Sequence, residues 1–534
     1  MEKKMLSGNK SDIAQTNRIR SLPKKATNCY LYAVLCLLPL VFVNYYADIA
    51  YVKYYFYIGC SIIFFAVLLS YGIVFFYKNR EDFLKHKEWN AAKIVRNFWK
   101  HMTITEKLML GYLLIAAIST FQSDYFYESF WGNEGRLTGL FLTLIYGISF
   151  LLIGRFGSLK TRLMDAFLFA GNLVCLFGIT DYFQMDLLGF KENMWQEQLL
   201  MFTSTIGNIN IYTVVVAMFA AVAMILFIAE RKTGKKVYYY ITLIIVLFAL
   251  ITGQSDNAYV SLLALFGLSP LYLFRYRWGI KGYSISVATL LSVILCVDFC
   301  SKNIPNAIVL GGIMGIIGSL EFFPLIVAAA WVIAAVIIWM DRNHKEAEAS
   351  VWWRRGWIGL IVLVCIAVVY VLYDCNVAGN AEKYGPIQSY VLLNDRWGTN
   401  RGYIWRVALE CYGDYPWYRK LVGFGPDTFG IITYHKYRPE MQQLFGEIYD
   451  STHNEYIQYL VTVGAAGLLL YLSMIAASVK RIWKKQKDNP LAMAVMFALI
   501  CYWMQAVVNI NIPISAALMW TLWGLSMAAC RKPQ

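Results

Sequence analysis

Long apolar runs separated by short polar segments recur along the whole chain. Each run approaches the roughly 20 apolar residues that an α-helix needs to cross the ~30 Å hydrocarbon core of a bilayer. The pattern therefore predicts an all-α polytopic membrane protein with about 14 transmembrane helices. The predicted helix centres are Leu37, Phe65, Leu114, Tyr146, Val174, Val222, Ile244, Ala264, Ser292, Ile333, Leu363, Leu468, Phe497 and Trp520.

One long segment, residues 374–455, interrupts this pattern with polar, charged and aromatic residues. A loop of this length in a compact protein is usually functional or disordered, and its tryptophans and tyrosines argue against disorder. Apolar residues recur at helical spacing within Arg401–Cys411, which predicts a helix there. The glycines and proline at 423, 425 and 426 then break the helical pattern.

The predicted organisation places this large loop between two sets of membrane helices. The segments are a basic N-terminus (1–28), transmembrane helices one to eleven (29–373), the large loop (374–455), transmembrane helices twelve to fourteen (456–530) and a short tail (531–534).

The composition excludes an ordinary soluble protein. Hydrophobic residues make up 59% of the chain and charged residues 15%, whereas a typical soluble domain carries about 25% charged residues. If the N-terminus is cytoplasmic, 36 of the 48 Lys and Arg residues lie in cytoplasmic segments, where short loops are enriched in them. The net charge of +15 therefore predicts two cytoplasmic termini and an outer large loop, and it does not indicate a nucleic-acid partner.

The cysteines and the short motifs predict no metal and no cofactor. Most of the 11 cysteines lie in apolar runs, and their spacing fits no zinc, haem or iron–sulfur site. A disulfide between Cys375 and Cys411 in the large loop is a minor alternative. Neither a GxxxxGK[ST] loop nor a GxGxxG turn after a strand is present. The energy for any reaction must therefore come from the substrate or from an ion gradient.

His453 is the first candidate for chemistry, because it lies where the large loop re-enters the membrane. A histidine there can act as a base or as a hydrogen-bonding anchor. The alternative is structural: a helix begins near Glu455, and Ser451, Thr452 and Asn454 are ordinary residues for its N-cap.

Arginines supply the second kind of candidate. Arg396, Arg401 and Arg406 are spaced by five residues in the large loop, and guanidinium groups bind phosphate in bidentate fashion. They suit an anionic lipid headgroup, although a solvated helix face is equally expected. Arg136 lies at the outer start of the fourth span, where pairing with Glu134 and contact with substrate are equally expected.

These segments resemble the superfamily of O-antigen ligases and polymerases, which are bacterial membrane glycosyltransferases. The resemblance is carried by Arg401-x3-Trp405, by GFGPDTF at residues 423–429 and by HNEYIQYLVTVGAAGLL at residues 453–469. FWGNEGRLTG around Arg136 and TIGNIN around Asn208 resemble two weaker family segments.

Two positions depart from the family pattern. The chain has Gly-Asn-Ile-Asn at residues 207–210 where Gly-Asn-Pro-Asn is common, and it has Ser255-Asp256 where many members carry Ser-Arg. The missing arginine removes one expected phosphate contact, and Arg136 is a candidate to replace its charge.

The resemblance implies a GT-C-like enzyme of the bacterial cytoplasmic membrane. Its expected donor is an oligosaccharide on a polyprenyl diphosphate, and its expected acceptor is a sugar hydroxyl on a glycan or a lipid-linked molecule. The surrounding membrane lipids are further expected partners. Transfer is expected to invert the anomeric carbon without a metal. His453 and Arg401 are the expected catalytic residues. The expected substrate contacts are Arg136, Arg396, Arg406, Asn454, Asn208, Asn210, Asp256 and Trp405.

Other functions stay open at this stage. Within the family, a polymerase that extends repeat units and a ligase that moves a finished glycan are not distinguished by these residues. A lipid-linked glycan flippase or transporter is the main alternative of another class, but no internal repeat joins the two halves. A structural envelope protein would leave the Arg and His cluster unexplained.

Overall fold

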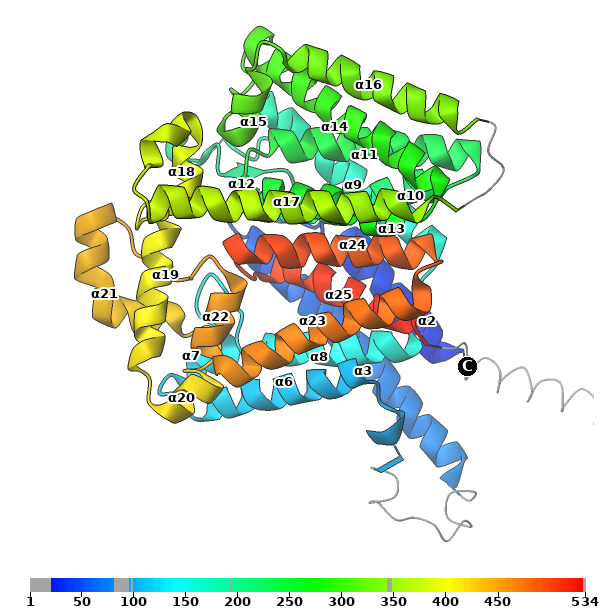
Figure 1. Cartoon of the computed structure of the whole chain (residues 1–534). Coiled ribbons are helices and arrows are strands. Elements are labelled where there is room, and N and C mark those ends of the chain that lie inside the picture. Colours follow the sequence, from blue (N-terminus) through cyan, green and yellow to red (C-terminus); the bar gives the residue numbers. More distant parts are fainter. Residues whose placement is uncertain (1–20, 81–95, 98, 193, 343–347, 532–534) are drawn as a thin grey trace, which may run out of the picture.

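The computed structural model describes residues 21–80, 96–97, 99–192, 194–342 and 348–531 (Figure 1). Most of the predicted N-terminal segment 1–28 and nearly all of the tail 531–534 therefore lie outside the described residues. The chain is mostly helical, and the strands assigned within the described part form one short hairpin.

In the first half of the chain, helices precede and follow that hairpin in the sequence. They are α2 (Leu22–Tyr32), the π-helix η1 (Ala33–Leu37), α3 (Ile49–Lys78), α6 (Ile104–Phe121), α7 (Phe126–Trp131), α8 (Leu140–Phe156), α9 (Thr161–Tyr182), η2 (Gln196–Gln198), β1 (Phe202–Thr203), β2 (Gly207–Asn208), α10 (Ile209–Ala229), α11 (Thr233–Thr252), α12 (Asp256–Leu268) and α13 (Pro270–Leu273). The antiparallel hairpin pairs Phe202 with Asn208 and Thr203 with Gly207.

The second half contains the large loop and the last membrane helices. Its elements are α14 (Arg277–Asn303), α15 (Gly312–Gly318), α16 (Phe323–Met340), α17 (Val351–Asn376), η3 (Ala381–Ile387), α18 (Gln388–Val391), α19 (Trp397–Asp414), α20 (Trp417–Val422), α21 (Phe429–Phe445), α22 (Glu455–Thr462), α23 (Gly464–Gln486), α24 (Pro490–Gln505), η4 (Ala506–Val508) and α25 (Pro513–Ala529).

All 14 predicted centres fall inside helices. In the described part of the chain, 10 helical segments are long and apolar enough to cross a membrane, namely α3, α6, α9, α10, α11, α14, α16, α17, α23 and α24 with η4. The other four centres, at Leu37, Tyr146, Ala264 and Trp520, lie in shorter helical segments. The chain is thus a multi-pass membrane protein, whereas the number of spans stays a prediction.

Helix α10 is the centre of the bundle. Every side chain from Ile211 to Ile228 is buried, as expected of a helix that is apolar on all sides. It packs against α11 and α24, and α24 in turn packs against α25. Helices α16 and α17 instead lie at the periphery and expose most of their apolar side chains, which fits contact with lipid.

The large loop folds over one end of the bundle, and the last described residues lie at the opposite end (Figure 1). Its predicted helix is confirmed as part of α19, because Tyr403, Ile404, Val407, Ala408 and Cys411 are each at most 2% exposed. These side chains pack on α21 residues such as Phe429 and Met441. Cys375 and Cys411 are both buried and both thiols are free.

Candidate functional site

Two glycines let the large loop lie directly against the helices that follow it. A Cβ atom on Gly423 would collide with the backbone of Thr462, and a Cβ atom on Gly464 would collide with the backbone of Leu421. Both glycines have positive φ, +82° and +71°. The Gly425 N–H also donates to the Thr462 carbonyl at 2.9 Å. The GFG and GAAG segments are therefore contact points between the loop and the bundle.

Asp427, in the same turn, joins the large loop to the segment that carries Arg136. Its buried carboxylate accepts the backbone N–H groups of Asn133 at 2.7 Å and Thr138 at 3.0 Å. Burial raises the pKa of Asp427 to about 6, although these hydrogen bonds favour the charged form. We did not identify Asp427 from its local sequence, because its partners lie almost 300 residues earlier.

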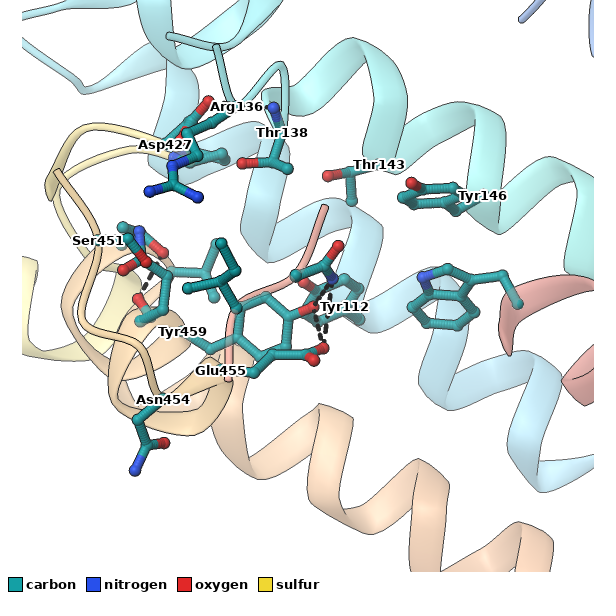
Figure 2. A pocket seen from close by; sticks show the side chains of 17 residues that line it. Tyr112, Arg136, Thr138, Thr143, Tyr146, Asp427, Ser451, Asn454, Glu455 and Tyr459 are labelled. Atoms are coloured by element: carbon teal, nitrogen blue, oxygen red, sulfur yellow. Dashed lines mark hydrogen bonds between the residues drawn. The ribbon is translucent and has the colours of Figure 1, made fainter. Parts of the chain in front are cut away.

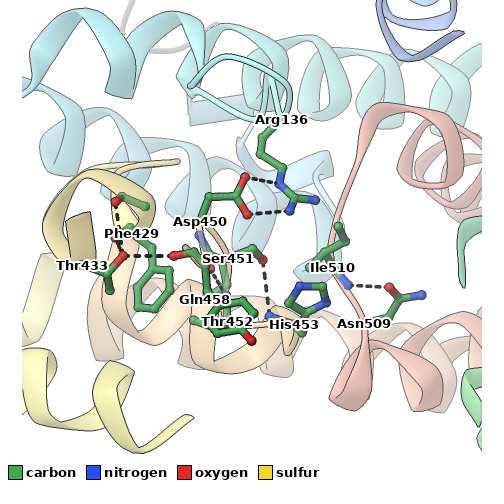
Figure 3. A network of polar contacts seen from close by, with 12 residues as sticks. Arg136, Phe429, Thr433, Asp450, Ser451, Thr452, His453, Gln458, Asn509 and Ile510 are labelled. Atoms are coloured by element: carbon green, nitrogen blue, oxygen red, sulfur yellow. Dashed lines mark hydrogen bonds and ion pairs between the residues drawn. The ribbon is translucent and has the colours of Figure 1, made fainter. Parts of the chain in front are cut away.

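Arg136 forms an ion pair with Asp450 of the large loop (Figure 3). Its Nε lies 2.9 Å and its Nη2 2.6 Å from the two Asp450 carboxylate oxygens, a bidentate geometry. Burial opposes ionisation of Asp450, but the Arg136 guanidinium outweighs it and holds the pKa of this carboxyl below its usual value. The expected structural partner, Glu134, is not the one the structure shows.

The turn that carries His453 is held at both ends. Before it, the Trp405 indole Nε1 donates to the Thr452 carbonyl at 2.9 Å. After it, the Asn454 side chain accepts the N–H groups of Tyr456 and Ile457 and caps α22, which confirms the predicted helix start near Glu455. His453 itself has φ +48°, a conformation that non-glycine residues rarely adopt outside constrained sites.

His453 is neutral at pH 7. Burial lowers its pKa, the positive charges of Arg401 and Arg136 lower it further, and Asp450 offsets only part, so that the pKa falls to about 4. Since both guanidinium groups act on the same imidazole, the structure brings together the three residues that the sequence placed on two distant segments. An uncharged imidazole can accept a proton or a hydrogen bond.

Arg401 is only 9% exposed. Its Nη1 donates to the Gly398 carbonyl at 2.8 Å, while its Nε has no hydrogen-bond partner among the described residues. Burial lowers the pKa of Arg401, and the charge of Asp256 partly restores it. Asp256, the first residue of α12, therefore lies near Arg401 of α19. A buried guanidinium with an unused donor is a ready binding group for an anion.

The two other arginines of the large loop, Arg406 and Arg396, differ in their surroundings. Arg406 forms ion pairs with Asp395 at 2.9 Å, Glu410 at 2.8 Å and Glu440 at 3.6 Å, which is the solvated helix face considered above. Arg396 is exposed just before α19. Substrate contact by either arginine stays a prediction.

The two asparagines of the Gly-Asn-Ile-Asn segment shape the start of α10. Asn208 caps that helix by accepting the Asn210 N–H at 2.9 Å. Asn210 in turn accepts the Ser255 hydroxyl at 2.7 Å, directly before Asp256. Their observed roles are structural, and they fix where α12 begins.

A cavity of about 50 Å³ lies below the Arg136 turn (Figure 2). Arg136, Glu455, Tyr459 and Asn511 line it. The Glu455 Oε1 accepts hydrogen bonds from Tyr459 at 2.8 Å, from Tyr471 at 3.1 Å and from Asn511 at 3.2 Å. We did not single out Glu455 from the sequence, although a tyrosine four residues later was a visible signal. In the part of the chain that is described, no group of three His, Cys, Asp or Glu residues gathers as metal ligands.

Comparison with known families supports the resemblance. Residues 307–472 match the model of the family described as O-antigen ligase. The matched range contains Arg401, Trp405, the GFGPDTF segment and His453, but not Arg136 or Asn208. No curated protein matches the chain.

Proposed function

Because the chain belongs to the O-antigen ligase superfamily, we propose that it transfers or polymerises a glycan at the outer face of the bacterial cytoplasmic membrane. The donor in this proposal is an oligosaccharide on a polyprenyl diphosphate, and the acceptor is a sugar hydroxyl. The observation that supports the proposal is the grouping of His453 with Arg401 and Arg136: burial lowers the pKa of His453, and the charges of both arginines lower it further.

The leaving group explains the two arginines. When the bond between the anomeric carbon and the diphosphate breaks, its electron pair goes to the diphosphate oxygen, so negative charge grows there. Preorganised positive charge stabilises such a group in the transition state by several kcal/mol. The unused Nε of Arg401 and the half-exposed Arg136–Asp450 pair offer donors for it. No nucleotide is needed, because the glycosyl diphosphate is already activated.

His453 serves the other side of the reaction. The acceptor hydroxyl loses its proton to the imidazole while its oxygen forms the new bond to the anomeric carbon. In the free protein burial makes His453 a weak base, and the two arginines weaken it further. A bound diphosphate would neutralise their charge and raise the pKa of His453, so the base strengthens only when the donor is in place. We propose direct displacement with inversion and without a metal, since the arginines supply the positive charge.

The test compares wild type with His453→Ala and Arg401→Ala in the native host. We expect both variants to accumulate lipid-linked precursor and to lose long surface polysaccharide at normal protein levels. Unchanged polysaccharide in both variants contradicts the proposal. A flippase defect would leave the precursor on the cytoplasmic leaflet, so a leaflet-specific assay separates the two functions.

The choice between polymerase and ligase depends on the acceptor. Purified protein in liposomes with lipid-linked repeat units alone yields longer lipid-linked chains if it is a polymerase. A ligase consumes the same donor only after a different acceptor is added.

A further inference from the structure

A second cavity, of about 230 Å³, lies beside the start of α12. It is lined by the end of α9, the β1 hairpin segment and the turn between α11 and α12. At ~30 Å³ for each water molecule, it has room for about seven waters, comparable to one sugar ring. None of the residues assigned to the His453 cluster lines it.

Asp181 provides an unused hydrogen-bond acceptor in this cavity. The residue is 2% exposed, and its Oδ2 accepts the Ser204 N–H at 2.6 Å and the Thr203 hydroxyl at 3.2 Å. Its Oδ1 is buried and accepts no hydrogen bond from any described residue; the Lys191 ammonium is 3.7 Å away. The ion pair with Lys191 balances the charge of Asp181, but 3.7 Å is too long for a hydrogen bond. This buried oxygen therefore keeps an unused capacity to accept one.

Gln254 provides an unused donor in the same cavity. Its Oε1 accepts the Gly311 N–H at 3.1 Å, which fixes the orientation of the amide. Its Nε2 is buried and finds no acceptor within the described ranges. The cavity therefore combines one free acceptor and one free donor, and Tyr182 and Phe202 add aromatic walls.

We propose that this cavity binds one neutral sugar residue of the glycan substrate. Each sugar hydroxyl both donates and accepts a hydrogen bond, so it can satisfy Asp181 and Gln254, while the C–H faces of the ring suit aromatic walls. The carboxylate of Asp181 and the ammonium of Lys191 both line the cavity and balance each other's charge, which suits a neutral ligand. This inference rests on the proposed glycan transfer and adds a saccharide subsite to it.

The subsite is joined to the catalytic cluster by residues 254–256, where the turn after α11 leads into α12. Gln254 precedes by two residues Asp256, whose charge acts on Arg401. Between them, Ser255 is anchored to Asn210. A glycan whose diphosphate lies at Arg401 can therefore extend along this turn, with one sugar in the cavity.

The experiment measures binding and turnover separately. The probe is the oligosaccharide released by mild acid from the lipid-linked precursor of host cells. Gln254→Glu keeps the acceptor oxygen but removes the donor, and Asp181→Asn removes the free carboxylate oxygen. For each we expect about tenfold weaker oligosaccharide binding and a KM raised by about tenfold, as for one lost hydrogen bond, with kcat little changed.

Asp165→Asn is the matched control. Asp165 lies in the same helix α9 and forms an ion pair with Lys235 at 2.8 Å, but it does not line the cavity. Its variant should bind and transfer as wild type does. If Gln254→Glu and Asp181→Asn, both folded, also match wild type in binding and KM, the cavity holds only water and the inference fails. Absence of transfer by wild type would instead contradict the proposed function.

Discussion

At the scale of single residues, the site depends on how neighbouring charges set the protonation of His453. The imidazole is partly buried and is subject to the positive charges of Arg401 and Arg136, so protonating it would add a third positive charge to the same region. His453 therefore stays neutral in the native state at a pH at which it takes up a proton in the unfolded chain, that is, below pH ~6.5.

This difference predicts an acid-dependent loss of stability. The pKa of His453 is lowered to about 4 in the native state, so its contribution is complete above pH ~6.5 and is lost as the pH falls toward 4. When the pH is lowered from 7.5 to 5, the free energy of unfolding should fall by about 2 kcal/mol more in wild type than in His453→Gln. Thermal unfolding of both proteins in detergent at the two pH values measures this, and equal losses would show that His453 titrates normally.

The Arg136–Asp450 pair allows a second test at this scale. If Arg136 stabilises the leaving diphosphate, Arg136→Ala should lower kcat by about 10²–10³, whereas Asp450→Ala should lower it much less. If the arginine serves only to hold Asp450, the two single variants and the double variant should be equally slow. Full glycan transfer by Arg136→Ala would end the idea that this residue replaces the family arginine absent at Asp256.

At the scale of elements, the sequence predicts the features that depend on residues close together in the chain. The apolar spacing in Arg401–Cys411 predicted a buried helix face, because a helical repeat is contained within a few turns. Each centre predicted from hydropathy falls inside a helical segment, but the centres and lengths of those segments were not all predicted. Leu37 is the last residue of η1, and α12 ends at Leu268, directly before a serine and a proline. The links that build the site join distant segments, such as Asp427 with residues 133–138, and no local pattern contains them.

The contact between the large loop and α22 predicts the effect of a single methyl group. Gly423 has φ 82° and ψ −172°, a region essentially restricted to glycine, and its Cβ would meet the Thr462 backbone. Gly423→Ala should therefore lower stability by roughly 3 kcal/mol or more, since strain and overpacking add. Thermal unfolding measures this loss of stability, and the length of the surface polysaccharide shows its effect on function.

Gly446→Ala is the control for that variant. Gly446 also has positive φ, +70°, but nothing lies within 4 Å of its Cβ position. Gly446→Ala should lower the free energy of unfolding by only about 1–2 kcal/mol, the usual cost of the left-handed conformation for a residue with a Cβ atom. An equal effect at the two glycines would mean that the close approach of loop and bundle contributes little.

At the scale of the whole molecule, two features of the chain agree. The basic segments assigned to the cytoplasm include the region after α23, and the large loop covers the other end of the bundle in the structure (Figure 1). A donor with its diphosphate at Arg401 can enter only from the leaflet at that end. The proposed function therefore requires the large loop to face the outside of the cell, and a measurement of its orientation tests both the function and the topology.

Cysteine labelling in intact cells decides the orientation. Glu447 is exposed in the large loop and Lys487 is exposed after α23, so Glu447→Cys and Lys487→Cys report opposite ends of the bundle. The exposed cysteines Cys29, Cys296 and Cys365 are first replaced by serine to remove background. A membrane-impermeant maleimide should label Glu447→Cys in intact cells and Lys487→Cys only after permeabilisation. The reverse pattern would put the arginines and His453 in the cytosol, where the positive-inside distribution would be violated and the proposed donor, displayed on the outer leaflet, could not reach them.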